Sequence, residues 1–294
     1  MVGHSPALDT LRDSIIRSGS AFLRNARWVP GVTCPTCAGI LNPGFSECRP
    51  CAERAGSPLL ADNLGFLTYG WDGGQAGRVM YAYKANGATS YQLISSILGY
   101  AVVAHWDCIA RHAGGHPDGW AYVPSLSGRQ GVHPLAQIAL QFMGSVPNVP
   151  IIANQVADGA RTFNAAHFTV QPTTARHVLL LDDTWTTGGH LQSASAALKV
   201  AGVEQFTGLA VARWLDPDWS TTKTFMADLP STSTQLCVPT QVCRADADLD
   251  ESHRGRRSCS VCALLVCLGI AKPKAPPSGR NFRGSLPNPP RWTC

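Results

Sequence analysis

One segment organises the chain: His177-Val-Leu-Leu-Leu-Asp-Asp-Thr-Trp-Thr-Thr-Gly-Gly-His190, followed by Leu-Gln-Ser-Ala-Ser-Ala-Ala-Leu-Lys-Val-Ala-Gly202. Its apolar run, Val178 to Leu181, has no alternation, which predicts a strand buried on both faces of a parallel sheet. Two carboxylates, Asp182 and Asp183, follow this run, and small residues then lead into an Ala-rich stretch. The segment therefore predicts a strand, a turn and a helix, with an acidic pair at the turn.

The turn has the composition of an anion site. Thr186 and Thr187 offer hydroxyls, and Gly188 and Gly189 allow close approach to the unpaired N–H groups at a helix N-terminus. Adjacent carboxylates would repel a phosphate unless they accept hydrogen bonds from sugar hydroxyls or act through a cation. A sugar phosphate satisfies both conditions. The alternatives are an ordinary strand and helix with an acidic end, or a phospho-acceptor aspartate in a receiver-like fold.

This segment resembles the ribose-phosphate loop of type I phosphoribosyltransferases. The resemblance implies binding of 5-phosphoribosyl 1-diphosphate with magnesium. It assigns the ribose hydroxyls to Asp182 and Asp183, and the 5-phosphate to the residues from Thr186 to Gly189. The sequence departs from the family pattern at Thr184 and Trp185, where aliphatic residues are usual, and at His190, where Ser or Thr is usual.

Four cysteines near the N-terminus form two Cys-x-x-Cys pairs, Cys34 with Cys37 and Cys48 with Cys51, and ten residues separate the pairs. This spacing can close a tetrahedral thiolate site, and in a reducing compartment zinc explains it better than disulfides do. Four protein ligands leave no open coordination position, so we expect a structural zinc. Redox cysteines and plain buried cysteines are the alternatives.

A four-cysteine module before a ribose-phosphate loop resembles the ComF-like branch of the family, which occurs in bacterial competence. Members carry a lysine after aromatic and basic positions, and Tyr81-Ala-Tyr-Lys84-Ala-Asn-Gly87 matches that pattern. Arg161-Thr-Phe-Asn-Ala-Ala-His-Phe168 resembles the segment that members carry in a mobile loop over the substrate. We therefore name Arg161 as a candidate catalytic residue, with an ordinary solvated arginine as the alternative.

A second candidate loop follows the predicted strand 121–124. Ser125, Ser127, Gly128 and Arg129 supply hydroxyls, backbone N–H groups and a guanidinium for a bidentate phosphate contact. The resemblance implies that this is the diphosphate loop.

The order of the expected elements predicts an α/β fold with a doubly wound, mostly parallel sheet and the site at the carboxyl ends of the strands. We expect a helix from Ser5 to Trp28 that breaks near Gly19. Further along the chain we expect helices 91–104 and 134–143 and strands 149–152 and 206–213. The expected organisation is an N-terminal helix (1–30), a zinc module (31–56), a phosphoribosyltransferase-like domain (57–215), a Cys-rich extension (216–270) and a disordered tail (271–294).

The C-terminal part is less informative. Five cysteines there could form a second metal site: Cys237, Cys243, Cys259, Cys262 and Cys267. Residues 244–294 hold nine Lys/Arg and four Asp/Glu, which accounts for the net charge of +5 and makes nucleic acid a candidate partner.

With 45% hydrophobic and 15% charged residues, the chain has the composition of a globular protein. We expect a cytoplasmic protein without a membrane span, because no apolar run reaches the necessary length and no leader pattern is present. Two functions remain open. One is a phosphoribosyltransferase that acts on a nitrogen nucleophile, and the other is a non-catalytic protein of DNA uptake, in contact with competence-machinery proteins, whose pocket serves as a sensor or scaffold.

Overall fold

The computed structural model describes residues 6–85, 87–126, 131–155 and 162–229. The elements in chain order are α1 (Pro6–Gly19), α2 (Arg49–Arg54), β1 (Asn63–Trp71), α3 (Gln75–Ala82), η1 (Tyr83–Ala85), α4 (Ala88–Ala113), β2 (Gly119–Tyr122), α5 (Pro134–Leu140), β3 (Ile151–Ala153), η2 (Ala165–His167), β4 (Phe168–Val170), β5 (His177–Trp185), α6 (Gly189–Val200), β6 (Gln205–Leu215) and α7 (Ser220–Ala227). The C-terminal cysteines and the basic segment lie outside the described residues.

The main sheet has four parallel strands in the order β1-β6-β5-β2. The apolar run of β5 is buried throughout, as the sequence predicts for a strand with cover on both faces. This confirms an α/β fold with a mostly parallel sheet.

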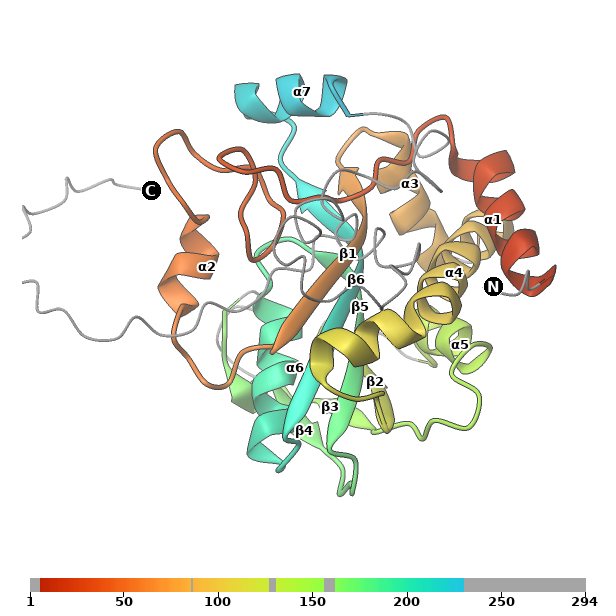
Figure 1. The fold of residues 1–294 in the computed structure, drawn as a ribbon, viewed down its shortest axis with the longest axis vertical. Coiled ribbons are helices and arrows are strands. Elements are labelled where there is room, and N and C mark those ends of the chain that lie inside the picture. The colour runs from red at the N-terminus through yellow and green to blue at the C-terminus, as the bar shows by residue number, and fades with distance from the viewer. Residues whose placement is uncertain (1–5, 86, 127–130, 156–161, 230–294) are drawn as a thin grey trace, which may run out of the picture.

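Helices cover both faces of this sheet (Figure 1). On one face α3, α4 and α5 pack against Leu179, Leu181 and Leu209, and α1 packs on α4. On the other face α6 and the cysteine module pack against Phe66, Leu180 and Phe206. The cysteine module is therefore part of the core and not an appendage on a linker.

The expected strand 149–152 is not a strand of the main sheet. Residues 151–153 form β3, which pairs antiparallel with β4 in a separate two-stranded sheet. Among the described residues, a single isolated bridge, between Asn148 and Trp120, connects this part of the chain with the edge strand β2. The Val149 N–H still donates to the Trp120 carbonyl, whereas the Pro150 carbonyl accepts from the Gln171 N–H, so from this point the chain pairs with the β4 segment instead.

Helix α4 is longer than expected. Its residues 88–111 are long and apolar enough to cross a membrane by length and composition, although no such segment was expected from the sequence. In this fold 61% of the apolar window is buried, and Cys108 is fully buried in the core. Packing between the sheet and α1 accounts for its apolar character.

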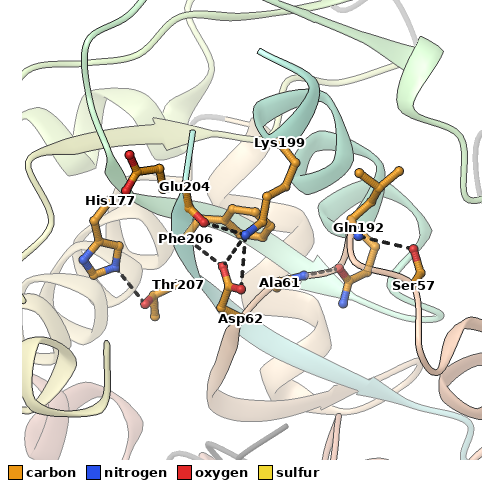
Figure 2. A network of polar contacts seen from close by, with 10 residues as sticks. Ser57, Ala61, Asp62, His177, Gln192, Lys199, Glu204, Phe206 and Thr207 are labelled. Atoms are coloured by element: carbon orange, nitrogen blue, oxygen red, sulfur yellow. Dashed lines mark hydrogen bonds and ion pairs between the residues drawn. The ribbon is translucent and has the colours of Figure 1, made fainter. Parts of the chain in front are cut away.

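The amino ends of the strands carry a polar network (Figure 2). The Lys199 ammonium lies 3.0 Å from Asp62 Oδ2, donates to the Glu204 carbonyl and lies over the Phe206 ring. The same Asp62 oxygen accepts a hydrogen bond from the Phe206 N–H at 3.0 Å. These contacts satisfy backbone groups at the amino ends of the strands, whereas the acidic pair lies at the carboxyl ends.

Candidate functional site

The acidic pair lies at the carboxyl end of β5, and both side chains are buried. The strand continues two residues beyond them, to Trp185. Because Tyr122 pairs with Leu181, the chain that leaves β2 emerges beside the carboxylates. The structure thus brings together the acidic pair and the beginning of the predicted diphosphate loop, Ser125, at one edge of the sheet.

Asp183 faces η1 and the start of α5 and has cationic and hydroxyl partners there. Lys84 Nζ lies 2.6 Å and the Tyr83 hydroxyl 2.7 Å from its Oδ2. His133 Nε2 lies 3.6 Å from the same oxygen, while its Nδ1 accepts a hydrogen bond from the Leu135 N–H. Burial acts to raise the pKa of Asp183, but the Lys84 ion pair and the Tyr83 hydrogen bond hold it below its ordinary value. Asp183 is therefore a carboxylate at neutral pH.

Asp182 has the opposite protonation state. Burial, together with the neighbouring Asp183 charge, raises the pKa of Asp182 to about 8. Its Oδ1 accepts a hydrogen bond from the Asp183 N–H at 2.8 Å. Side chains of adjacent strand residues point to opposite faces, so Asp182 lies on the side of α6. The pair thus carries one negative charge near neutral pH, and each member faces a different part of the site.

The loop after β5 is built on a buried tryptophan. Trp185 packs edge-on against Phe66 in the core. Gly188 adopts a left-handed φ of 80°, and a Cβ atom there would come within 2.2 Å of the Trp185 ring. Glycine is therefore required both by the backbone and by the ring beneath it. This explains how the loop accepts an aromatic residue where an aliphatic one was expected.

The loop presents donors where α6 begins. Thr186 is exposed and Thr187 is half-buried, so their hydroxyls can reach a ligand. Within the described part of the chain, the backbone N–H groups of Thr187, Gly188 and Gly189 donate no hydrogen bond to another residue. Together with the positive end of the α6 dipole, these groups suit a phosphate or another small anion.

The four predicted zinc ligands lie together. The sulfur atoms of Cys34, Cys37, Cys48 and Cys51 are all within 4.8 Å of one another, and three of these residues are buried. Four sulfurs around zinc, with bonds of about 2.3 Å, would stand about 3.8 Å apart, so the cluster can close on the metal with small movements. The Cys34, Cys48 and Cys51 thiols, aided by nearby Arg213, hold the pKa of Cys37 well below its ordinary value despite burial. The donor set fits a thiophilic metal such as zinc.

Several predicted site residues lie outside the described residues, namely Ser127, Gly128, Arg129 and Arg161. The chain directly after Arg161 is not the open loop that was expected. Asn164 donates its backbone N–H to Ser193 Oγ of α6 at 2.9 Å and caps η2, and Phe168 is buried at the start of β4. The segment 162–170 therefore packs against α6.

The structure adds residues to the predicted site. Lys84 was noted only as part of a family pattern, and its ion pair with Asp183 gives it a physical role. Tyr83 and His133 reach the same carboxylate, and neither carries a sequence signal that separates it from a core aromatic or a helix cap. Arg213 did carry a signal, because a charged residue in an otherwise apolar buried strand needs buried partners.

Comparison with the models of protein families finds no match for this chain, and no curated protein matches it either.

Proposed function

We propose that this chain binds 5-phosphoribosyl 1-diphosphate with magnesium at the carboxyl end of β5, in the manner of type I phosphoribosyltransferases. The observation that carries the proposal is the placement of a partly protonated carboxyl pair beside a glycine turn at the start of α6. A ligand that has both a diol and a phosphate uses both features.

In this proposal the loop from Thr186 to Gly189 binds the 5-phosphate, and Asp182 on the same side accepts hydrogen bonds from the ribose diol. Asp183 positions Lys84 toward the diphosphate that the chain after β2 would bind. Magnesium, when bound with the ligand, would offset the charge of the diphosphate. Transfer would join a nitrogen nucleophile to C1 of the ribose while the C1–O bond to diphosphate breaks, and the diphosphate leaves with the bonding electrons. Positioning and charge stabilisation would account for most of the rate enhancement.

The binding step is tested by calorimetric titration of the full chain with phosphoribosyl diphosphate, with magnesium and again with a chelator. Ribose 5-phosphate is the control ligand, because it lacks the diphosphate. We expect binding that depends on magnesium and is stronger than that of ribose 5-phosphate. Equal binding of the two ligands, or none, would overturn the proposal.

The catalytic step is tested separately, by diphosphate release in the presence of nucleobases and amines. Release that requires one of these acceptors supports a transferase. Binding without release for any acceptor would favour the non-catalytic alternative, a sensor or scaffold that has kept the pocket.

A further inference from the structure

A buried arginine connects the cysteine cluster with the anion loop. Arg213 lies in β6 with an exposed fraction of only 7%. Its Nε donates to the Cys37 carbonyl at 2.8 Å, and its Nη2 lies 3.4 Å from the Cys37 sulfur. Its Nη1 donates to the carbonyls of Trp185 at 3.3 Å and Thr186 at 3.0 Å. One guanidinium therefore contacts a predicted metal ligand and the first residues of the loop at the same time.

A second arginine makes a parallel connection. Arg54 ends helix α2, which also carries Cys51. Its Nη1 donates to the Thr187 carbonyl at 2.6 Å, and its guanidinium lies over the Phe163 ring. The carbonyls of three consecutive residues are thus held by guanidinium groups that belong to, or lie against, the cysteine module.

These contacts orient the loop. In a trans peptide the C=O and the N–H of the same unit point in opposite directions. When the carbonyls of residues 185, 186 and 187 turn toward the arginines, the N–H groups of Thr186, Thr187 and Gly188 turn away from them. The arginines on one side therefore help to point the anion-binding donors to the other side.

The fit of Arg213 is close. A Cβ atom at Gly39 would come within 1.9 Å of Arg213 Nη2, so only glycine at this position leaves room for the guanidinium. Because Gly39 and Cys37 belong to the same turn, a shift of that turn displaces the acceptors of Arg213.

We propose that metal loading of the cysteine cluster positions the anion loop through Arg213 and Arg54, so that the metal-loaded chain binds phosphate groups more tightly than the metal-free chain. The loop's role in phosphate binding rests on the proposed function above. Without a metal, no bonds tie the sulfurs of Cys34 and Cys37 to those of Cys48 and Cys51. The turn at Cys37 is then free to open, and the loop carbonyls lose their fixed donors.

Hydrogen exchange of the full chain, loaded with zinc and then treated with a chelator, tests the connection without any ligand. Metal analysis confirms that the metal is lost, and the amides of the β5 core, residues 178–181, serve as the internal control for global unfolding. We expect the amide of Gln192, which donates to the Gly188 carbonyl at 3.0 Å and so reports opening of the loop, to exchange at least about tenfold faster after metal removal. Unchanged exchange of the loop after proven metal loss would overturn the proposal.

Two variants examine the arginines with the metal in place. Arg213→Met should reproduce the fast loop exchange of the metal-free chain while it keeps its zinc. Because this variant removes a buried cation and could fail to fold, Arg54→Met is the second test, with a smaller effect on the same Gln192 amide. Loop exchange equal to wild type in folded, zinc-loaded Arg54→Met would contradict the proposed role of Arg54.

Titration of the same samples with phosphoribosyl diphosphate and magnesium separates this inference from the proposed function. Binding at least about tenfold weaker in the metal-free chain supports both. If the hydrogen exchange of the loop responds to metal but the zinc-loaded chain binds no ligand, the proposed function is refuted and the structural connection stands. Equal binding by both forms, with unchanged exchange, would refute the connection and keep the function.

Discussion

At the scale of single residues, the two adjacent carboxyl groups of the acidic pair differ in protonation state: one is neutral and the other is charged. Asp182 has a pKa of about 8 because it is buried beside Asp183, whereas Lys84 and Tyr83 keep Asp183 ionised. Two adjacent aspartates in a sequence look equivalent. Their protonation states depend on side chains about a hundred residues away, which no local pattern reveals.

Asp182→Asn should flatten the dependence of stability on pH. The folded pKa of Asp182, about 8, lies above its ordinary value of 3.8, so folding takes up a proton between these values. The stability of the wild type therefore falls as pH rises toward 8, by at most about 1.4 kcal/mol per pH unit from this group. Asparagine does not titrate, and thermal unfolding from about pH 5 to about pH 8 should show a smaller slope. Equal slopes for the two proteins would contradict the raised pKa.

Lys84→Met should destabilise the fold by about 2 to 3 kcal/mol, because it leaves the buried Asp183 charge without its cation. The control is Arg176→Met, which breaks an exposed pair with Glu204 at a similar distance of 2.7 Å. That change should destabilise the fold much less, because water screens an exposed pair. Urea denaturation of both variants measures the difference, and similar losses would show that the Lys84 pair has no special environment.

At the scale of elements, the continuous apolar run and the glycine turn allowed β5 and α6 to be predicted, because a strand buried on both faces and a helix N-terminus have local signatures. The first helix ends at Gly19, where a break was expected, but residues 20–28, which were also expected to be helical, form no helix. The pairing of β3 with β4 could not be predicted, since it depends on the partner that a short apolar stretch meets in three dimensions. The burial of Arg213 had a sequence signal, but its partners could not be predicted, because they come from two turns that are distant in the sequence.

Gly188→Ala should damage the turn more than the same change at another left-handed glycine. The substitution adds the strain of a positive φ, about 1 to 2 kcal/mol, and drives a methyl group into the buried Trp185 ring. Gly202→Ala is the matched control, because Gly202 has a φ of 93° and nothing within 4 Å of its Cβ position. We expect Gly188→Ala to lower the melting temperature more than Gly202→Ala does, and only Gly188→Ala to lose ligand binding. A similar melting temperature and normal ligand binding in both variants would show that the ring does not support the loop.

At the scale of the whole molecule, the cysteine module is part of the core that also holds the β5 end of the sheet. Elemental analysis of the purified chain should find about one zinc per chain, lost when Cys34 and Cys37 are both replaced by serine. Because these residues pack in the core, that double variant should also unfold at a lower temperature. A fully folded wild-type chain without metal would contradict the zinc assignment.

The polar network around Asp62 lies at the amino ends of the strands, away from the acidic pair. Asp62→Asn weakens the contacts with Lys199 and the Phe206 N–H at the amino edge and should cost about 1 to 2 kcal/mol of stability. Because the acidic pair lies at the opposite edge, this variant should bind ligand as the wild type does. Chemical denaturation gives the stability change.

The most direct test of the proposed site compares three proteins in one titration with phosphoribosyl diphosphate and magnesium. Wild type and Asp62→Asn should bind with equal affinity, and Asp182→Leu, which removes both acceptor oxygens at the carboxyl end of β5, should bind up to about a hundredfold more weakly. Equal binding by Asp182→Leu and wild type would contradict the assignment of the site to the end of β5.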